Sequence, residues 1–302
     1  MITRPTLFIL GAGASCCYHF PSGRELIFKI AEGNRERRTS HVLQGATTWM
    51  GHDIDTVAKC AVELIASELP SVDLFLENHR NYEAIGKALI ASELIPCENP
   101  LNLRRGAKLK WLEYLYGHMV SNSKRDTFTD NRVSFITFNY DRSVEHFFFT
   151  ALKYSFNLPD DELWQMLEHI PIVHVYGQLG NFGPQEGARL FTSEVTETTV
   201  GIAAAGIKVI HEIDEDVLPE YKRAHELLAQ AEVVCFLGFG YQEDNVRRLK
   251  AGTIKSYDVF SGTGYGLESA ERSKAAQLVG GKLTIDQPDR DCTLFLRNQA
   301  IF

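Results

Sequence analysis

The sequence lacks several features that would place it in a familiar class. None of its six cysteines belongs to a Cys-x-x-Cys pair, and this absence argues against a structural zinc ribbon. No apolar run approaches the roughly 18 residues that cross a membrane, and the apolar run that begins at Leu7 is only four residues long, too short for a secretory signal. We therefore expect no membrane segment, a cytoplasmic location and reduced thiols.

An excess of basic residues is also missing. The chain of 302 residues has a formal net charge of −8 at pH 7, which argues against binding of nucleic acid or an anionic membrane by the whole surface. Hydrophobic residues make up 44% of the chain and charged residues 23%, as is typical of a globular protein with a sizeable core. Because no repeat, low-complexity tract or linker divides the sequence, we expect a single domain over residues 1–302.

Short apolar runs that end in glycine or polar residues recur along the chain, as buried parallel strands do. The expected strands are residues 7–10, 133–138, 172–176, 233–237, 257–260 and 283–285. Helical spacing of apolar residues lies between them, at residues 143–153, 219–231, 244–250, 267–278 and 291–297. Residues 178–204, rich in Gly and Thr, are expected to form a loop. This alternation predicts an α/β fold with a doubly wound parallel sheet.

The chain departs from this alternation after its first strand. Ser22 is suited to cap a helix that begins near Arg24. Helical spacing then continues without a convincing strand at residues 54–69, 72–78, 82–94 and 107–120. We interpret residues 25–125 as a helical insertion subdomain, and residues 1–24 and 126–302 as a Rossmann-like core that binds a nucleotide.

The sharpest motif is Gly11-Ala12-Gly13-Ala14-Ser15, directly after the first strand. Gly11 can adopt the backbone angles of a tight turn, and Gly13 has no Cβ to keep a diphosphate away from the main chain. A phosphate there would meet free backbone N–H groups and a helix amino terminus. Cys16 stands where the dinucleotide fingerprint has a third glycine, and no acidic residue lies on a second strand about 20 residues on, so an ordinary dehydrogenase is disfavoured. The triplet also fits a plain strand-to-helix turn.

Polar residues and glycines follow other strands at the same edge of the predicted sheet. Asn139 and Asp141 come after the second strand, and His174 lies near the end of the third. Gly238 and Gly240 follow the fourth. This set suits cleavage of a glycosidic bond: Asn139 can hold a water or a ribose hydroxyl, Asp141 a nicotinamide amide, and His174 can accept a proton. Plainer explanations stay open, since Asn139 and Asp141 can cap the next helix and His174 can be a core histidine.

Taken together, these motifs resemble the SIR2-like (sirtuin-fold) family, and in particular the bacterial branch that cleaves NAD in anti-phage defence. Residues 11–15 look like its Gly-Ala-Gly-x-Ser phosphate loop. Residues 137–141 look like its Thr-x-Asn-x-Asp motif, whose Asn and Asp contact ribose and nicotinamide. Gly238-Phe239-Gly240 stands in place of a Gly-Thr-Ser turn that binds ribose and phosphate.

Weaker similarities extend this resemblance over nearly the whole chain. Pro21 and Arg24 fall where a Gly-Ile-Pro-Asp-Phe-Arg segment has Pro and Arg, although Ser22 and Gly23 replace its Asp and Phe. Residues 71–76 are similar to a Ser-Ile-Asp-x-Phe-Leu segment in the helical part of the defence branch, and residues 291–296 to the closing helix of the family. The resemblance implies that NAD is bound by Gly11, Ala12, Gly13, Ser15, Pro21, Arg24, Asp141, Gly238 and Gly240.

The catalytic base is the point at which the chain departs from the family. The family's catalytic histidine directly precedes a glycine, whereas Tyr176 precedes Gly177 here. His174 lies two residues earlier and so projects from the same face of a strand. A phenol with a pKa near 10 is a poor general base at neutral pH. We favour His174 as the base, and Tyr176 as its replacement stays the alternative.

The resemblance implies an NAD glycohydrolase that needs no metal and releases nicotinamide and ADP-ribose, with Asn139 positioning the water or the ribose. It also implies a homo-oligomer, and a partner such as a defence ATPase that restrains NAD loss. Two alternatives stay open. An NAD-dependent protein deacylase is disfavoured by the missing zinc ribbon, and a non-catalytic sensor of NAD or ADP-ribose is favoured by Tyr176.

Overall fold

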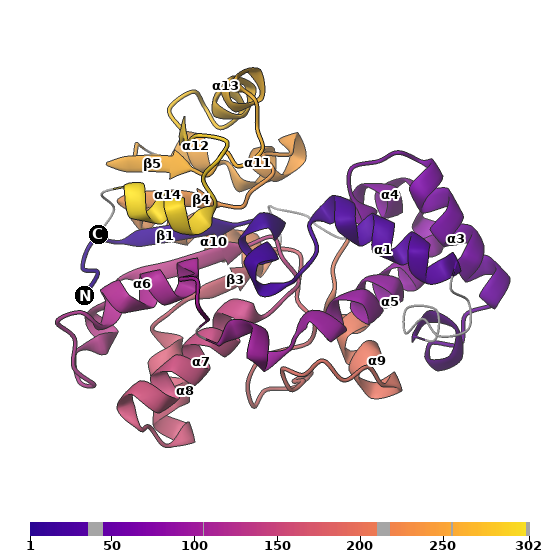
Figure 1. The fold of residues 1–302 in the computed structure, drawn as a ribbon, viewed down its shortest axis with the longest axis horizontal. Helices are drawn as coiled ribbons and strands as arrows, with labels where there is room; N and C mark the ends of the chain where they lie inside the picture. The colour runs from indigo at the N-terminus through magenta and orange to yellow at the C-terminus, as the bar shows by residue number, and fades with distance from the viewer. Residues whose placement is uncertain (36–44, 105, 210–217, 255, 300–302) are drawn as a thin grey trace.

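The computed structural model describes residues 1–35, 45–104, 106–209, 218–254 and 256–299. Within these residues the centre of the molecule is a parallel sheet of six strands in the order β3-β2-β1-β4-β5-β6 (Figure 1). The strands are β1 (Thr6–Leu10), β2 (Val133–Thr137), β3 (Ile172–His174), β4 (Val233–Leu237), β5 (Val259–Gly262) and β6 (Thr284–Ile285).

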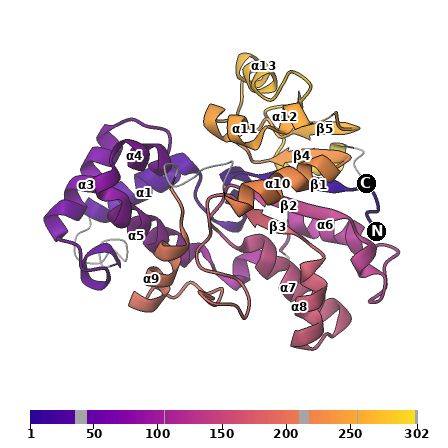
Figure 2. The same ribbon diagram turned by 180° about the vertical axis from the view of Figure 1, so that it is seen from behind.

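β1 is the central strand, and all five of its residues are buried. It pairs in parallel with β2, where Phe8 lies opposite Phe135, and with β4, where Phe8 lies opposite Cys235. A parallel strand that is apolar on both faces needs helices on both sides of the sheet. α6 (Trp111–Val120) and α14 (Cys292–Asn298) cover one face (Figure 1), and α10 (Pro219–Gln230) covers the other (Figure 2). The predicted doubly wound α/β fold is therefore confirmed.

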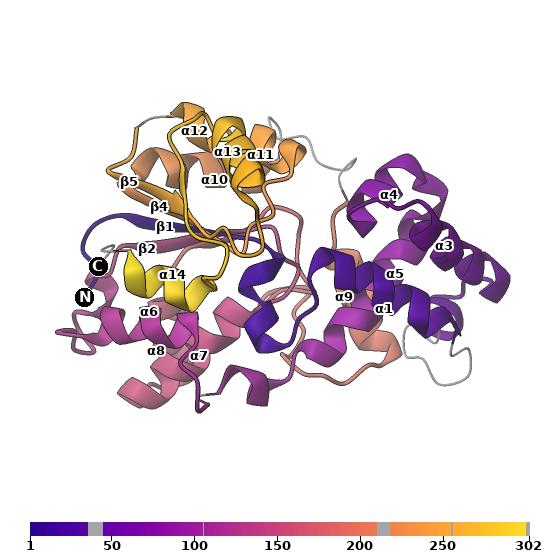
Figure 3. The ribbon, with the colours of Figure 1, turned by 45° about the horizontal axis from the view of Figure 1, so that its top comes forward.

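The long segment between β1 and β2 consists of helices and turns, with no strand among its described residues. Its helices are α1 (Gly23–Arg35), α3 (Ile54–Ala66), α4 (Val72–Asn78), α5 (Glu83–Leu94) and α6, joined by the short turns η3 (Gly45–Trp49), η4 (Arg80–Tyr82), η5 (Ile95–Cys97) and η6 (Pro100–Leu103). Figures 1 and 3 show α1, α3, α4 and α5 grouped beyond the carboxyl ends of the central strands, at the opposite end from the N-terminus. α6 instead lies on the sheet beside α14.

The remaining helices follow the strands of the core. They are η1 (Ala12–Ala14), η2 (Cys16–Tyr18), η7 (Phe128–Asp130), α7 (Ser143–Phe156), α8 (Asp160–Glu168), α9 (Glu197–Gly206), α11 (Glu243–Leu249), α12 (Ala251–Ile254) and α13 (Ser269–Leu278). The predicted cap of the first long helix is confirmed: the Glu25 N–H donates to Ser22 Oγ at 3.3 Å, and the Ser22 N–H to Glu25 Oε2 at 2.7 Å. These reciprocal bonds fix where α1 begins.

Several expectations about local structure are wrong. Residues 178–204 are not loop throughout, because α9 begins at Glu197 with a capping box between Thr196 and Thr199. The buried side of α9 lies against α5 of the helical insertion. Contact with α5 stabilises α9, which its amino-acid composition alone does not predict. α8 was not expected either, and β5 begins at Val259 rather than Tyr257. β3 ends at His174 rather than Tyr176, so Tyr176 lies in the turn that follows the strand.

Candidate nucleotide-binding site

The order of the strands places a crevice at the ends of β1 and β4. The connections run from β1 toward β2 on one side and from β4 toward β5 on the other, so the loops after β1 and β4 separate and leave a space between them. A cleft of about 550 Å³ lies there, which we call the switch-point cleft. It is lined by Gly13, Cys16, Cys17, Ser22, Glu25, Trp111, Gly238, Phe239, Gly240, Thr263, Tyr265, Leu267, Asp291, Cys292 and Thr293.

Glycines at positions 11, 13 and 238 let two backbones touch at the floor of this cleft. A Cβ on Gly11 would lie 2.6 Å from the Gly238 carbonyl oxygen, and one on Gly13 would lie 2.9 Å from Gly238 Cα. Gly238 has a φ of +56°, and its Cβ would lie 2.0 Å from the Ala14 nitrogen. Side chains at these three positions are therefore excluded by sterics. Gly240, by contrast, faces open space.

This close contact overturns the expected row of free N–H groups in the glycine loop. Gly11 donates to the Leu237 carbonyl and Gly13 to the Gly238 carbonyl, both at 3.0 Å. Within the loop, the Ala14 N–H donates to Gly11 and the Ser15 N–H donates to Ala12. The end of β4 approaches so closely that its carbonyls use donors that a phosphate would need. The N–H of Ala12, a half-buried residue, takes part in none of these four hydrogen bonds.

Three polar side chains from the ends of β1 and β2 form one hydrogen-bonded cluster. Ser15 Oγ donates to Asp141 Oδ2 at 2.7 Å, and Asn139 Nδ2 lies 3.1 Å from Ser15 Oγ and 3.0 Å from the Gly11 carbonyl oxygen. Asp141 Oδ1 accepts the Ser143 N–H at 3.1 Å, directly before α7, although the N-cap residue of that helix is Arg142. Burial raises the pKa of the Asp141 carboxyl, although its hydrogen bonds to Ser143 and Ser15 oppose this shift.

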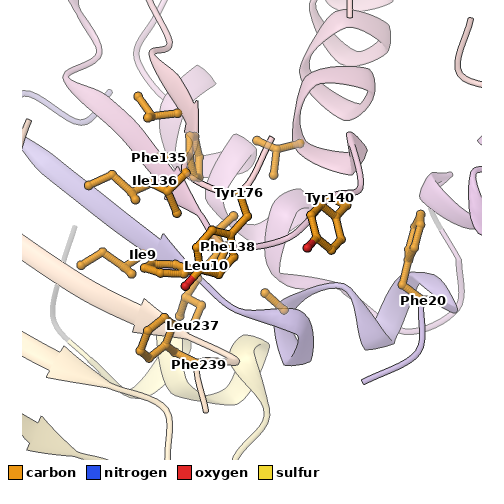
Figure 4. Packing of buried hydrophobic residues seen from close by; sticks show 14 of the residues in the cluster. Ile9, Leu10, Phe20, Phe135, Ile136, Phe138, Tyr140, Tyr176, Leu237 and Phe239 are labelled. Atoms are coloured by element: carbon orange, nitrogen blue, oxygen red, sulfur yellow. The ribbon is translucent and has the colours of Figure 1, made fainter. Parts of the chain in front are cut away.

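The helical segment reaches this cluster through Asp73. Tyr140, between Asn139 and Asp141 in the sequence, donates its hydroxyl to Asp73 Oδ1 at the start of α4. Burial raises the pKa of the Asp73 carboxyl, and the bond from Tyr140 opposes that shift. Figure 4 shows the Tyr140 ring among the buried side chains at the carboxyl end of the sheet. Two motifs that are distant in the sequence, residues 71–76 and 137–141, are therefore in direct contact.

His174 contacts the backbone of this cluster but does not line the switch-point cleft. Its Nδ1 lies 2.9 Å from the Asn139 carbonyl oxygen, to which it donates, and its Nε2 lies 2.6 Å from Glu145 Oε1 on α7. Burial of the ring lowers the pKa of His174, but the charge and hydrogen bond of Glu145 outweigh it, and the net shift of the pKa is upward. Both ring nitrogens of His174 thus have hydrogen-bond partners. The role of His174 as general base stays a prediction, and it requires the imidazole to leave Glu145.

Tyr176, the alternative base, is buried between aromatic side chains. Its ring meets Phe138 edge to face with centroids 5.5 Å apart, and Phe138 meets Phe239 in the same way at 5.0 Å (Figure 4). The Tyr176 hydroxyl donates to Asn245 Oδ1 at the start of α11. Burial raises the pKa of the Tyr176 phenol well above its usual value. The Tyr176 hydroxyl is therefore held by Asn245, and Tyr176 does not line the switch-point cleft.

The structure thus brings most of the predicted nucleotide-binding residues together and separates a few. Gly11, Gly13, Ser15, Asn139, Asp141 and Gly238 are joined by direct contacts. Gly240 lines the cleft, Pro21 is buried beside the start of α1, and Arg24 is exposed on the first turn of that helix. His174 lines a different pocket, shared with Glu145.

Sequence reasoning missed two residues that support the cleft. Trp111, within the predicted helical stretch of residues 107–120, donates its indole N–H to the Ala14 carbonyl at 2.7 Å. Thr263 Oγ1 accepts the Gly238 N–H at 2.8 Å and so holds the second loop. The signal for Thr263 was the Gly262-Thr263-Gly264 run after a strand. Trp111 carried no signal, because a buried tryptophan on an apolar helix face is most often core.

The fold and this site define a Rossmann-like α/β protein with a cleft at the switch point of its sheet. No model of a known protein family matches the chain, and no curated protein matches it either. Across the described ranges, no group of three His, Cys, Asp or Glu side chains is arranged to hold a metal ion. No helix in those ranges combines the length and apolar character needed to cross a membrane. The likeness to SIR2-like proteins therefore stays a prediction from the motifs.

Proposed function

We propose that the chain binds NAD in the switch-point cleft and hydrolyses the bond between nicotinamide and ribose. The observation that supports binding most directly is the position of the cleft, which the loops after β1 and β4 line from both sides. Doubly wound sheets bind nucleotides at this point, and a volume of about 550 Å³ is within the range of small-molecule sites. The hydrolytic reaction rests on the resemblance of residues 137–141 to the NAD-cleaving family.

In the proposed reaction, water adds to the ribose carbon as the bond to nicotinamide breaks. Nicotinamide leaves with the bonding electron pair as a neutral molecule, and the attacking water loses one proton. Asn139 would hold the ribose or the water, since its amide already lies at the glycine loop. His174 would take the proton at Nε2 after its own Nε2 proton has passed to Glu145 and the ring has left that carboxyl group, because Nδ1 is held by the Asn139 carbonyl. The proposal includes a homo-oligomer and a restraining partner such as a defence ATPase, because unchecked NAD loss poisons a cell.

A second candidate function is an NAD or ADP-ribose sensor without turnover. The observation that favours it is that both candidate bases have partners: His174 contacts Glu145 and the Asn139 carbonyl, and Tyr176 contacts Asn245. A sensor would bind the same nucleotide in the same cleft. The two functions therefore differ in product formation and not in affinity.

The test is to mix the purified chain with NAD and to measure binding by calorimetry and free nicotinamide by chromatography. We expect nicotinamide and ADP-ribose in equal amounts, and a loss of turnover of at least about a hundredfold in Asn139→Ala, because a group that positions the reactants is removed. Asn78→Ala, on an exposed part of α4, is the matched control and should keep full activity.

The other outcomes are distinct. Binding without nicotinamide release would favour the sensor, and release that strictly requires an acyl-lysine peptide would favour a deacylase. Full activity in Asn139→Ala would remove the mechanism, and absence of NAD binding would remove the proposal as a whole.

A further inference from the structure

A second pocket lies against His174, and among the described residues it shares no lining residue with the switch-point cleft. Its volume is about 390 Å³. α7 contributes Glu145, α8 contributes Trp164 and Glu168, β3 contributes His174, and the loop that follows contributes Gln178 and Phe182. We call it the β3 pocket.

Two buried oxygen atoms in the lining side chains have no hydrogen-bond partner: Glu145 Oε2 and Gln178 Oε1. The orientation of Gln178 is determined by its neighbours. Its Nε2 donates to Asn181 Oδ1 at 3.1 Å, and Asn181 Nδ2 in turn donates to the Glu186 carbonyl at 2.5 Å. Asn181 therefore presents an acceptor to Gln178, and the Gln178 oxygen is left as an acceptor without a donor.

The Glu145 carboxylate is in a similar position. Its Oε1 is paired with His174 Nε2 at 2.6 Å, which leaves Oε2 buried and unpaired. His174 offers it no second donor, because Nδ1 is directed at the Asn139 carbonyl. A buried acceptor without a donor is costly. Both side chains line the pocket, and each unpaired oxygen exposes less than 1 Å² to solvent. A ligand with hydrogen-bond donors would satisfy the two acceptors after a small turn of these side chains toward it.

The charge and the walls of the pocket narrow the class of ligand. Glu168 adds a second carboxylate at the exposed side, and the described lining contains neither lysine nor arginine. The imidazole of His174 balances one carboxylate and not both. Trp164 and Phe182 form an aromatic wall with ring centroids 5.7 Å apart, a surface suited to a flat or cationic group.

We propose that the β3 pocket binds an organic cation with at least two N–H donors on a flat apolar body, the class to which amidinium and guanidinium compounds belong. The cation donates to Glu145 Oε2 and Gln178 Oε1, and its apolar part lies against Trp164. This site is separate from the proposed NAD-binding cleft, although Glu145 also pairs with His174, the proposed base. Benzamidine binding and nicotinamide release are separate measurements, so each of the two proposals can fail without the other.

The experiment uses benzamidine as the probe, with benzamide and benzoate as its neutral and anionic counterparts. Calorimetry should detect benzamidine binding, at least about tenfold weaker binding of benzamide and none of benzoate, because charge-assisted hydrogen bonds are the stronger ones. The chain has three tryptophans, of which Trp164 lines the β3 pocket and Trp111 the switch-point cleft. Trp164→Phe should abolish the fluorescence response to benzamidine and leave the response of Trp111 to NAD.

Variants of the two acceptors provide the decisive comparison. Glu145→Gln should weaken benzamidine binding at least about tenfold, and Gln178→Glu should strengthen it, because the second substitution adds a negative charge where a donor is expected. Glu162→Gln is the matched control on α8, since Glu162 pairs with Arg125 outside the pocket. Thermal melting curves establish that each variant is folded.

The proposal is overturned if benzamidine does not bind the unmodified chain, or if benzamide binds equally well. It is also overturned if the affinities of Gln178→Glu and Glu145→Gln both match that of the control. The nicotinamide assay follows turnover, which depends on His174 as well as on the switch-point cleft, whereas calorimetry with benzamidine follows the β3 pocket directly. Absence of nicotinamide release together with benzamidine binding therefore counts against the NAD proposal alone.

Discussion

Gly238 is the residue on which the shape of the switch-point cleft depends most directly. Its φ of +56° and the 2.0 Å that would separate a Cβ from the Ala14 nitrogen exclude a side chain on two separate grounds. We expect Gly238→Ala to lower the free energy of unfolding by at least about 2 kcal/mol, which combines left-handed strain with overpacking. Urea denaturation followed by circular dichroism measures this loss.

The matched control for that substitution is two residues away. A Cβ on Gly240 would meet no atom within 4 Å, so Gly240→Ala should leave the free energy of unfolding within about 0.5 kcal/mol of the parent value. Equal losses for the two substitutions would show that the contact between the loops after β1 and β4 does not carry the stability assigned to it.

The ion pair of His174 with Glu145 predicts how stability depends on pH. The pKa of His174 is raised in the folded state from the ordinary value of 6.5, so the folded chain holds this proton more tightly than the unfolded chain. The resulting stability is fully present below pH 6.5 and is lost as the pH rises through the folded pKa. Free energies of unfolding measured by urea denaturation at several pH values should therefore decrease as the pH rises above 6.5.

Glu145→Gln tests the sign of that dependence. Without the carboxylate, burial remains as the main influence and lowers the pKa of His174. The contribution of His174 should then reverse, so that stability is lost as the pH falls below 6.5. Parallel pH profiles for the parent and the variant would contradict the ion pair.

At the scale of elements, the sheet was the most predictable part of the molecule. β4 is a continuous apolar run and β1 and β2 are mostly apolar, because a parallel strand covered on both faces needs apolar side chains on each. α9 was not predictable, since its Thr- and Ala-rich sequence has little amphipathic character and its burial comes from α5, more than 100 positions earlier in the sequence. Helices stabilised by tertiary contacts leave little trace in local sequence.

The same distinction applies to the elements of the site. The glycines and Asn139 were found because they stand at strand ends, where a parallel sheet brings distant residues to one edge. The direction of His174 was not found. It depends on Glu145, which lies on α7 between β2 and β3 and whose carboxylate meets the histidine only in the folded chain. Strand alternation gives the face of a side chain but not its hydrogen-bond partner.

For the molecule as a whole, a single buried carboxylate joins the helical segment to the core. Glu98, which follows α5, is fully buried and accepts hydrogen bonds from Arg142 Nε at 2.9 Å and Nη2 at 2.5 Å. Arg189, in the long loop after β3, donates to the same carboxylate. Arg142 Nη1 also donates to the Arg189 carbonyl at 2.6 Å. Three segments that are far apart in the sequence thus converge on one side chain.

We expect Glu98→Gln to lower the free energy of unfolding by about 3–5 kcal/mol, because it leaves two buried guanidinium groups without a counter-charge. Glu162→Gln breaks the half-exposed pair with Arg125 and should change stability by about 1 kcal/mol or less.

Trp49 reports on the helical segment and Trp164 on the core, so fluorescence of single-tryptophan variants follows the two parts separately. Coincident transitions are expected in the parent chain, because the Glu98 network, the Tyr140–Asp73 bond and the contacts of α5 with α9 all join them. Separate transitions, or equal losses in Glu98→Gln and Glu162→Gln, would contradict a structure held together at this carboxylate.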